Sequence, residues 1–213
     1  MSGATDPALA QAMAALVLPG IVIGHRIIQP GDEKVLLETE ALTITAPGLE
    51  IRRASGAARI VGRELLKQLG VAEGAIPKRV SGAPLWPEGV TGSFAHDSIV
   101  AVAAAASRKN VGAVGIDVEP ATILPDETFD LVVTPRERDQ IALDPYRGRL
   151  IFAAKEAVYK TLHPLDGKFL DYPDIEVDLA AQKAVTKTGH TVDLRYCLST
   201  HIVAVAWLPT LAQ

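Results

Sequence analysis

The sequence predicts an α/β (α+β) protein made of two similar halves, each a small sheet packed on a long helix. Residues 99–103 read Ile-Val-Ala-Val-Ala, and the same five letters recur as residues 202–206. Each copy follows a long helical pattern, at 52–69 in the first half and at 149–162 in the second. The shared order of helix, loop and strand indicates an internal duplication.

The duplication also predicts how the chain is divided. We expect a seam near Gly112 between an N-terminal half, 1–111, and a C-terminal half, 112–213, which together form one compact unit. A cleft between two such halves is a preferred place for a ligand. Two halves in one chain also predict a monomer.

Turn residues and periodicity predict the elements of the first half in chain order. Residues 1–6 are expected to be disordered, and residues 7–17 predict a short helix ended by Pro19 and Gly20. Residues 21–24 and 34–38 predict strands or extended segments with a turn between them. The helix over 52–69 is closed by Gly70, a loop rich in proline and glycine spans 77–92, and one strand follows over 93–103.

The second half is predicted in the same way. Residues 111–120 alternate apolar and polar positions, as a strand with one apolar face does. Residues 120–147 are expected to be mostly irregular, with a helix start at Thr134 and a capping-box glutamate at Glu137. In the helix over 149–162, Ile151, Ala154 and Val158 recur at helical spacing and predict a buried stripe. A closing set of strands follows, including 174–178 and 194–198.

Composition limits the class of protein. The 213 residues carry a formal net charge of −4 with 48% hydrophobic residues, so we expect neither nucleic acid nor a membrane surface as a partner. The single cysteine excludes an intramolecular disulfide framework and is typical of a reducing compartment. The chain opens neither with a basic segment nor with an apolar run long enough to cross a membrane, so we expect a cytoplasmic protein.

Two carboxylates project from one face of the predicted strand over 111–120. Asp117 and Glu119 lie two positions apart and repel each other unless a cation compensates. Gly115 on the same face leaves room for a close approach to the backbone. Either the pair is a polar strand end, or it binds a metal or a positive group of a ligand.

The helix over 149–162 carries a third carboxylate. Glu156 and Lys160 lie four residues apart on the face opposite the apolar stripe, together with Arg149. They are either a solvated ion pair or part of a site. With Asp117 and Glu119, Glu156 would complete an oxygen site of the kind that Mg²⁺ takes.

The first long helix carries a cluster of arginines. They form either a solvated helix face or a set of forks for phosphate oxygens, since guanidinium groups match phosphate geometry. The cluster consists of Arg52, Arg53, Arg59 and Arg63.

Taken together, these motifs resemble the 4′-phosphopantetheinyl transferases of the surfactin-synthetase and enterobactin-synthetase type. The signature has two parts, Gly115-Ile-Asp-Val-Glu119 and Phe152-Ala-Ala-Lys-Glu-Ala-Val-Tyr-Lys160, at the spacing that the family has. The arginine helix and three shorter segments also match. These are Trp86-Pro-Glu-Gly-Val-Thr-Gly-Ser93 with His96, Thr134-Pro-Arg-Glu137 and Phe169-Leu-Asp-Tyr172.

The resemblance implies an enzyme of the holo-acyl-carrier-protein synthase type. Such enzymes move the 4′-phosphopantetheine arm of coenzyme A onto a serine of an acyl, peptidyl or aryl carrier protein and release adenosine 3′,5′-bisphosphate. The implied fold is two similar α/β halves. The implied partners are coenzyme A and the apo carrier protein, and Mg²⁺ is the implied cofactor.

The resemblance also implies roles for single residues. Asp117, Glu119 and Glu156 would hold Mg²⁺, Lys160 would neutralise the pyrophosphate, and Lys155 would lie beside the attacking serine. His96 with Arg52, Arg53 and Arg59 would bind the 3′-phosphate and adenine end, with the loop at Trp86 near the base and Ser93 in the same motif. Relatives carry a basic residue shortly before the Trp-Pro pair where this chain has Ser81, and Lys78 or Arg79 would substitute for it.

Two other functions use the same residues. One is Mg²⁺-dependent hydrolysis of a nucleotide pyrophosphate, and the other is non-catalytic binding of coenzyme A or a carrier domain. The pathway also stays open among siderophore, polyketide, nonribosomal peptide and fatty acid synthesis.

Overall fold

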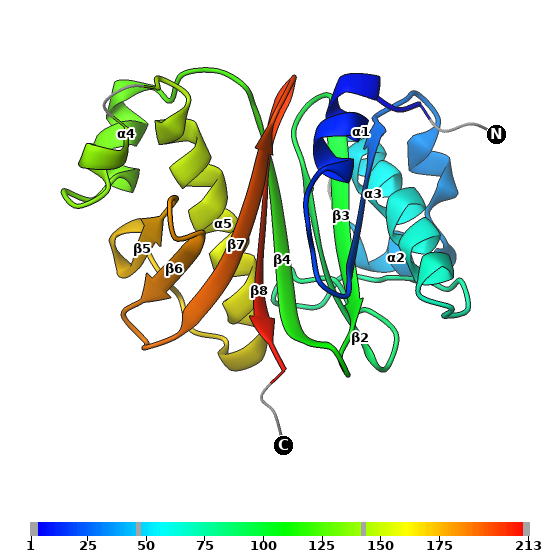
Figure 1. The fold of residues 1–213 in the computed structure, drawn as a ribbon. Coiled ribbons are helices and arrows are strands. Elements are labelled where there is room, and N and C mark those ends of the chain that lie inside the picture. The colour runs from blue at the N-terminus through cyan, green and yellow to red at the C-terminus, as the bar shows by residue number, and fades with distance from the viewer. Residues whose placement is uncertain (1–3, 46–47, 142–143, 211–213) are drawn as a thin grey trace.

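Two antiparallel sheets lie side by side in the centre of the molecule, and a long helix covers the outer face of each (Figure 1). The computed structural model describes residues 4–45, 48–141 and 144–210. The expectation of a mixed α/β protein with two halves is confirmed.

The first sheet has three strands in the order β1-β3-β2. These are β1 (Ile21–Ile27), β2 (Val90–His96) and β3 (Val100–Ser107), and the covering helix is α3 (Leu49–Gln68). The shorter elements of this half are α1 (Pro7–Ala14), the 3₁₀ turn η1 (Asp32–Val35) and α2 (Glu38–Thr43).

The second sheet has five strands in the order β4-β8-β7-β6-β5. They are β4 (Val111–Pro120), β5 (Ile175–Asp178), β6 (Lys183–Thr186), β7 (Thr191–Leu198) and β8 (His201–Pro209). The covering helix is α5 (Arg147–Asp166), and the remaining elements are α4 (Asp126–Val132), η2 (Arg138–Gln140) and η3 (Tyr172–Asp174).

The duplication is visible in the strand order. In the first half β1 precedes α3 and pairs with β3, and in the second half β4 precedes α5 and pairs with β8. The repeated five-residue segments lie in β3 and β8, the central strands of the two repeats. The chain passes from one sheet to the other between β3 and β4.

Both faces of the central strands are buried, which explains the unbroken apolar runs over residues 100–106 of β3 and 202–208 of β8. On β3, Val102 and Ala104 face a core shared by the two sheets, and Ala101 and Ala103 face α3. On β8, Val203 and Val205 face the shared core, while the alternate residues face α5. Strands buried on both sides lose the alternation of a half-buried strand.

Three expected elements differ in the structure. Residues 34–38 are not a strand, because η1 ends at Val35 and α2 begins at Glu38. Residues 93–103 are not one strand either: Asp97 Oδ1 accepts the N–H groups of Ile99 and Val100, and this turn separates β2 from β3. Residues 120–147 contain α4, which begins after Pro125 with two acidic residues in its first turn.

Residues 1–6 were expected to be disordered. Residues 1–3 lie outside the described residues, whereas Asp6 caps α1 by accepting the N–H groups of Ala8 and Leu9. The helix over 149–162 extends in the structure to Asp166 and is followed by Gly167 in a left-handed conformation (φ 67°).

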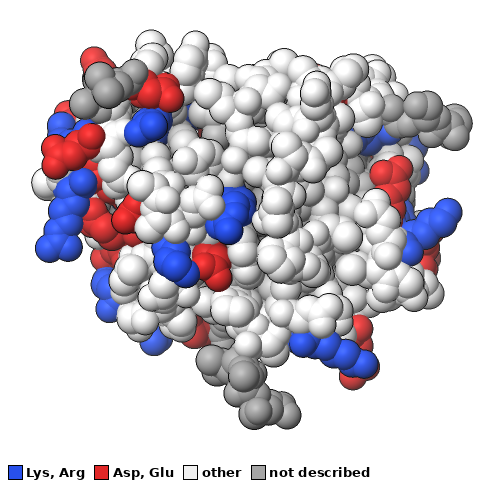
Figure 2. Space-filling model, in the orientation of Figure 1, with Lys and Arg blue, Asp and Glu red and all other residues white. Residues whose placement is uncertain are grey.

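Two further observations concern the surface and the helices. Figure 2 shows charged side chains of both signs mainly over α4, β5 and β6, and few over α1, β4 and β8 on the same face. In the part of the chain that the structure describes, no helix has the length and apolar character needed to cross a membrane.

Candidate active site

A close contact between α5 and β4 brings the two acidic motifs together. A Cβ atom at Gly115 would overlap the main-chain carbonyl oxygen of Ala157 on α5. Glycine is therefore required for this approach, so the group that approaches the backbone at Gly115 is the helix itself. The contact sets Lys160 and Glu156 beside Asp117 on the adjacent strand.

Asp117 is the most buried acidic residue of the cluster, with 5% exposure. Its Oδ1 accepts a hydrogen bond from Lys160 Nζ at 2.6 Å, while its Oδ2 is buried and has no hydrogen-bond partner among the residues that the structure describes. Burial raises the pKa of Asp117, with a further upward contribution from Glu156, and Lys160 opposes both. A buried carboxylate oxygen without a partner is rare and offers an open ligand position.

Glu156 is held by Tyr172. The Tyr172 hydroxyl donates to Glu156 Oε1 at 2.9 Å. Burial raises the pKa of Tyr172, and the bond to Glu156 raises it further, so the phenol stays protonated as a donor. This bond leaves the second oxygen of Glu156 available for another partner.

Glu119 is paired with Arg149. Arg149 Nη1 lies 3.0 Å from Glu119 Oε2, and Nη2 donates to the hydroxyl of Thr122 and the carbonyl oxygen of Ile123. Burial raises the pKa of Glu119, Asp117 raises it further, and Arg149 opposes them. The arginine thus partly neutralises the carboxylate farthest along the strand.

The three carboxylates provide hard oxygen atoms but are not arranged as a preformed cage. Among the residues that the structure describes, no group of three or more His, Cys, Asp and Glu side chains is positioned to hold a metal ion. Mg²⁺ takes one or two carboxylates and completes its shell with water and substrate phosphate. The unpartnered Oδ2 of Asp117 and the neighbouring charge of Glu156 fit such a partial site.

Lys155 lies elsewhere than expected. Its side chain is 0% exposed, and its Nζ lies 2.8 Å from Oε2 of the equally buried Glu137. Burial lowers the pKa of Lys155, and Glu137 offsets part of the effect. The expectation that Lys155 meets the serine of a carrier protein is corrected, because a fully enclosed ammonium cannot contact a docking protein.

Three cationic or titratable groups converge beside the carboxylates. His96, at the end of β2, is exposed at one edge, yet the surrounding protein lowers its pKa, and the charges of Lys160 and Arg59 lower it further. Arg59 is 6% exposed, lies over the ring of Phe94 at 4.9 Å and donates to the carbonyl oxygen of Ile76. Burial lowers the pKa of Arg59 to about 10. This convergence of positive potential suits an anion.

Two of the other arginines of α3, Arg53 and Arg63, have protein partners. Arg53 lies 3.2 Å from Glu33 and 3.3 Å from Glu50, and Arg63 donates to both oxygens of Glu40 at 3.0 and 3.2 Å. Arg52 is partly buried near the start of the helix. The cluster of four therefore does not act as one phosphate fork.

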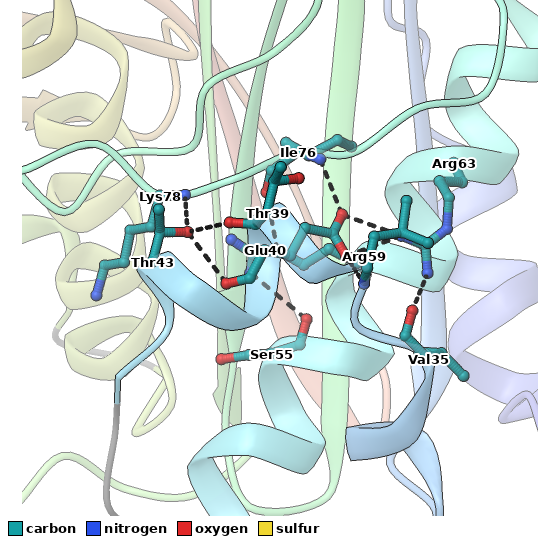
Figure 3. A network of polar contacts seen from close by, with 10 residues as sticks. Val35, Thr39, Glu40, Thr43, Ser55, Arg59, Arg63, Ile76 and Lys78 are labelled. Atoms are coloured by element: carbon teal, nitrogen blue, oxygen red, sulfur yellow. Dashed lines mark hydrogen bonds and ion pairs between the residues drawn. The ribbon is translucent and has the colours of Figure 1, made fainter.

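Glu40 is the centre of a buried polar network that the sequence did not reveal (Figure 3). Its side chain is 0% exposed and accepts from Arg63 and from the N–H group of Ile76 at 2.8 Å. Close by, the N–H group of Lys78 donates to Thr43 at 2.9 Å. The network ties α2 and α3 to the start of the loop that leads to Trp86.

A cavity of about 610 Å³ lies between the halves and is lined by this loop, β2 and the end of α5. Trp86 packs on Phe94 with ring centroids 4.9 Å apart, and both line the cavity. Of the residues expected at the coenzyme A site, Arg79, Trp86, Ser93 and Lys160 line this cavity. Lys78 is exposed next to it, and Arg52, Arg53, Arg59 and His96 are not among the lining residues.

Three residues of the site have contacts that were not expected from the sequence. Helical spacing placed Arg149 on the same face of α5 as Glu156, but it did not indicate the ion pair with Glu119. Tyr172 lies in the segment 169–172 that matches the family. Glu40 carried no signal, because a lone glutamate is normally exposed.

Comparisons with known proteins agree with this geometry. The family model described as the 4′-phosphopantetheinyl transferase N-terminal domain matches residues 40–106, and that of the 4′-phosphopantetheinyl transferase superfamily matches residues 113–206. The 4′-phosphopantetheinyl transferase Npt of Nocardia iowensis is 33% identical over 183 residues, covering 84% of this chain and 82% of that protein. Svp of Streptomyces mobaraensis is 33% identical, covering 78% and 70%, and PptT of Mycobacterium tuberculosis is 37% identical, covering 56% and 54%.

Proposed function

The chain belongs to the 4′-phosphopantetheinyl transferase superfamily and transfers the phosphopantetheine group of coenzyme A to a carrier protein, and we propose that this transfer depends on Mg²⁺. The proposed ligands are Asp117, Glu119 and Glu156. The observation that carries the proposal is the buried Oδ2 of Asp117, which lies near two further carboxylates and has no hydrogen-bond partner in the described part of the chain. When bound, Mg²⁺ would neutralise the charge that develops on the pyrophosphate.

Lys160 supplies a fixed cation for the same group. In phosphoryl transfer the protein mainly positions the reactants and stabilises charge. The serine oxygen of the carrier bonds to the phosphorus of the phosphopantetheine, the bond to the leaving phosphate breaks, and the serine loses its proton. We infer that Lys160 faces the departing adenosine 3′,5′-bisphosphate, and its hydrogen bond to Asp117 at 2.6 Å supports a fixed position for the ammonium.

We assign the nucleotide end of coenzyme A to the N-terminal half. The positive potential around His96 and Arg59 would bind the 3′-phosphate, supported by the mutual effect of these charges on the pKa of His96. Main-chain and side-chain groups of the cavity would hold the rest of the nucleotide. The residues proposed for this role are Arg79, Trp86 and Ser93, which line the cavity. The exposed Lys78 and the half-buried Arg52 and Arg53 do not line it and are proposed as further contacts of the nucleotide.

Incubating the protein with coenzyme A, Mg²⁺ and an apo carrier protein tests the proposal. We expect the carrier to gain the mass of one 4′-phosphopantetheine group, and we expect a chelator to prevent the gain. Cleavage of coenzyme A with no modified carrier would indicate a hydrolase. Binding of coenzyme A with neither product would indicate a binding module.

We also propose that the enzyme works as a monomer in the cytoplasm. The duplicated halves support a monomer, since the cleft between them is formed within one chain. The single cysteine, Cys197, supports a reducing compartment. Light scattering of the purified protein gives the oligomeric state directly.

A further inference from the structure

Lys155 and Glu137 form a buried ion pair that the proposed metal site does not use. Both side chains are 0% exposed, with 2.8 Å between Lys155 Nζ and Glu137 Oε2, and Nζ also donates to the carbonyl oxygen of Val132 at 2.7 Å. Replacing a buried ion pair by apolar residues of similar volume is often neutral or stabilising. Stability alone therefore does not account for the pair.

The ammonium of Lys155 holds the main chain of Tyr172. Nζ donates to the carbonyl oxygen of Tyr172 at 3.0 Å. Glu137 fixes the ammonium in turn, because its carboxylate also accepts the N–H groups of Thr134 at 2.9 Å and Val177 at 2.7 Å. Residues 132–137 and 172–177, two segments distant from Lys155 in sequence, thus set the position of the lysine relative to Tyr172.

Tyr172 is bound at two points by consecutive residues of α5. Its carbonyl oxygen accepts from Lys155, and its hydroxyl donates to Glu156 Oε1 at 2.9 Å. Its ring packs on Phe152 with centroids 5.6 Å apart. Because both bonds end on the same helix, a shift of the Tyr172 main chain would move the hydroxyl away from Glu156.

We propose that Lys155 and Glu137 are positioning residues, which fix Tyr172 so that its hydroxyl occupies Oε1 of Glu156 and leaves Oε2 to bind the metal. This inference rests on the proposed function, in which Glu156 is a ligand of Mg²⁺. It gives Lys155 an indirect role in place of direct contact with the carrier serine. Removing a residue that hydrogen-bonds a metal ligand typically weakens metal binding by about 10–100-fold.

The test measures the affinity of the whole chain for Mn²⁺ with coenzyme A present, from the electron paramagnetic resonance signal of free Mn²⁺. Tyr172→Phe removes only the hydroxyl, and Lys155→Met removes the ammonium but retains a long side chain. We expect each change to weaken Mn²⁺ binding at least about tenfold. We expect the double variant to bind no more weakly than the weaker single variant, because both act through one hydroxyl.

Matched controls lie in the same half of the protein. Tyr196→Phe removes a hydroxyl that contacts the carbonyl oxygen of Leu179, and Lys183→Met removes an ion pair with Asp193 in which the lysine is 51% exposed. We expect both to retain Mn²⁺ affinity within about twofold, since neither residue contacts a proposed ligand.

A further variant separates positioning from folding. Lys155→Met leaves Glu137 buried without its cation, so a lower melting temperature is expected as well. Lys155→Met with Glu137→Leu removes both charges. We expect this double variant to regain only part of the lost melting temperature, because the N–H groups of Thr134 and Val177 lose their acceptor, and to regain no Mn²⁺ affinity.

Several results would overturn the inference. An unchanged Mn²⁺ affinity in Tyr172→Phe would do so. So would a double variant, Tyr172→Phe with Lys155→Met, whose loss of Mn²⁺ affinity equals the product of the two single losses. Recovery of Mn²⁺ affinity together with melting temperature, on adding Glu137→Leu, would assign the pair a purely structural role. If the wild type itself bound no Mn²⁺, the proposed metal site would fail and this inference with it, a failure seen before any variant is made.

Discussion

The ammonium of Lys160 on α5 lies 2.6 Å from Oδ1 of Asp117 on β4. The side chain of the lysine is 29% exposed, whereas that of the aspartate is 7% exposed, so the pair joins the solvent-facing side of the cleft to a buried carboxylate. One charge can thus face the substrate while the other keeps an oxygen free for a metal. Lys160 therefore binds Asp117 on the neighbouring strand rather than Glu156, which lies four residues before it on the same helix.

Lys160→Ala is expected to lower kcat by about 10²-fold or more, because a preorganised cation at a developing charge is worth that much. The melting temperature is expected to fall too, since Asp117 loses its partner inside the protein. Adding Asp117→Asn should restore the melting temperature and leave transfer crippled. Lys160→Arg should rescue kcat only in part, because a planar fork cannot take the place of a compact ammonium. An unchanged kcat in Lys160→Ala would remove this residue from the mechanism.

His96→Gln is expected to raise the KM for coenzyme A more than it lowers kcat, because the 3′-phosphate is remote from the reacting phosphorus. The pKa of His96 lies below its usual value, so the ring is neutral at pH 7 in the free enzyme. A bound phosphate favours the protonated ring, so binding takes up a proton and weakens as the pH rises.

The pH dependence gives His96 a direct measurement. From about pH 6 to about pH 8, the KM of the wild type for coenzyme A should rise more than that of His96→Gln. With 3′-dephospho-coenzyme A the two proteins should behave alike. Equal pH profiles with coenzyme A itself would contradict the assignment.

Glu40→Ala is expected to lower the free energy of unfolding by about 3–5 kcal/mol, because it leaves Arg63 and the N–H group of Ile76 without their buried partner. Glu50→Ala is the matched control, since Glu50 is 84% exposed and also pairs with an arginine of α3. Chemical denaturation measures both. A variant of Glu40 as stable as the wild type would show that the network of Figure 3 is not needed for folding.

Gly115→Ala is expected to cost about 1–3 kcal/mol of stability and to impair transfer, because the new methyl group overlaps the carbonyl of Ala157 and pushes α5 from β4. Gly112→Ala, on the same strand, meets its nearest atom at 3.4 Å and should be tolerated. Thermal melts and carrier modification of the two variants give the comparison. Equal melting temperatures and equal carrier modification in the two variants would mean that the close contact at Gly115 does not position the site.

The parts of the site that depend on local periodicity could be predicted from the sequence. Alternation predicted that Asp117 and Glu119 share one face of β4, and helical spacing predicted the burial of Ile151, Ala154 and Val158. The positions of the other site residues depend on tertiary contacts. Lys155 follows the polar helix pattern, yet a glutamate from a distant loop receives it inside the protein.

The difference between local periodicity and tertiary contacts also explains why some elements were predicted wrongly. The apolar run at residues 34–38 suited a strand, but Glu40 caps α2 by accepting the N–H group of Leu37, and its contacts with α3 hold the segment in helical form. A buried side-chain network of this kind joins residues far apart in the chain. No periodicity in the sequence reports it.

The metal site is tested most directly by the metal dependence of transfer to an apo carrier protein, measured for the metal-stripped wild type and Asp117→Asn from the mass of the carrier. We expect no modified carrier without metal, full modification of the carrier by the wild type once Mg²⁺ is added, and no recovery of Asp117→Asn under the same conditions. Full transfer by metal-stripped protein in the presence of chelator, or by Asp117→Asn with Mg²⁺, would show that Asp117 does not hold a catalytic metal.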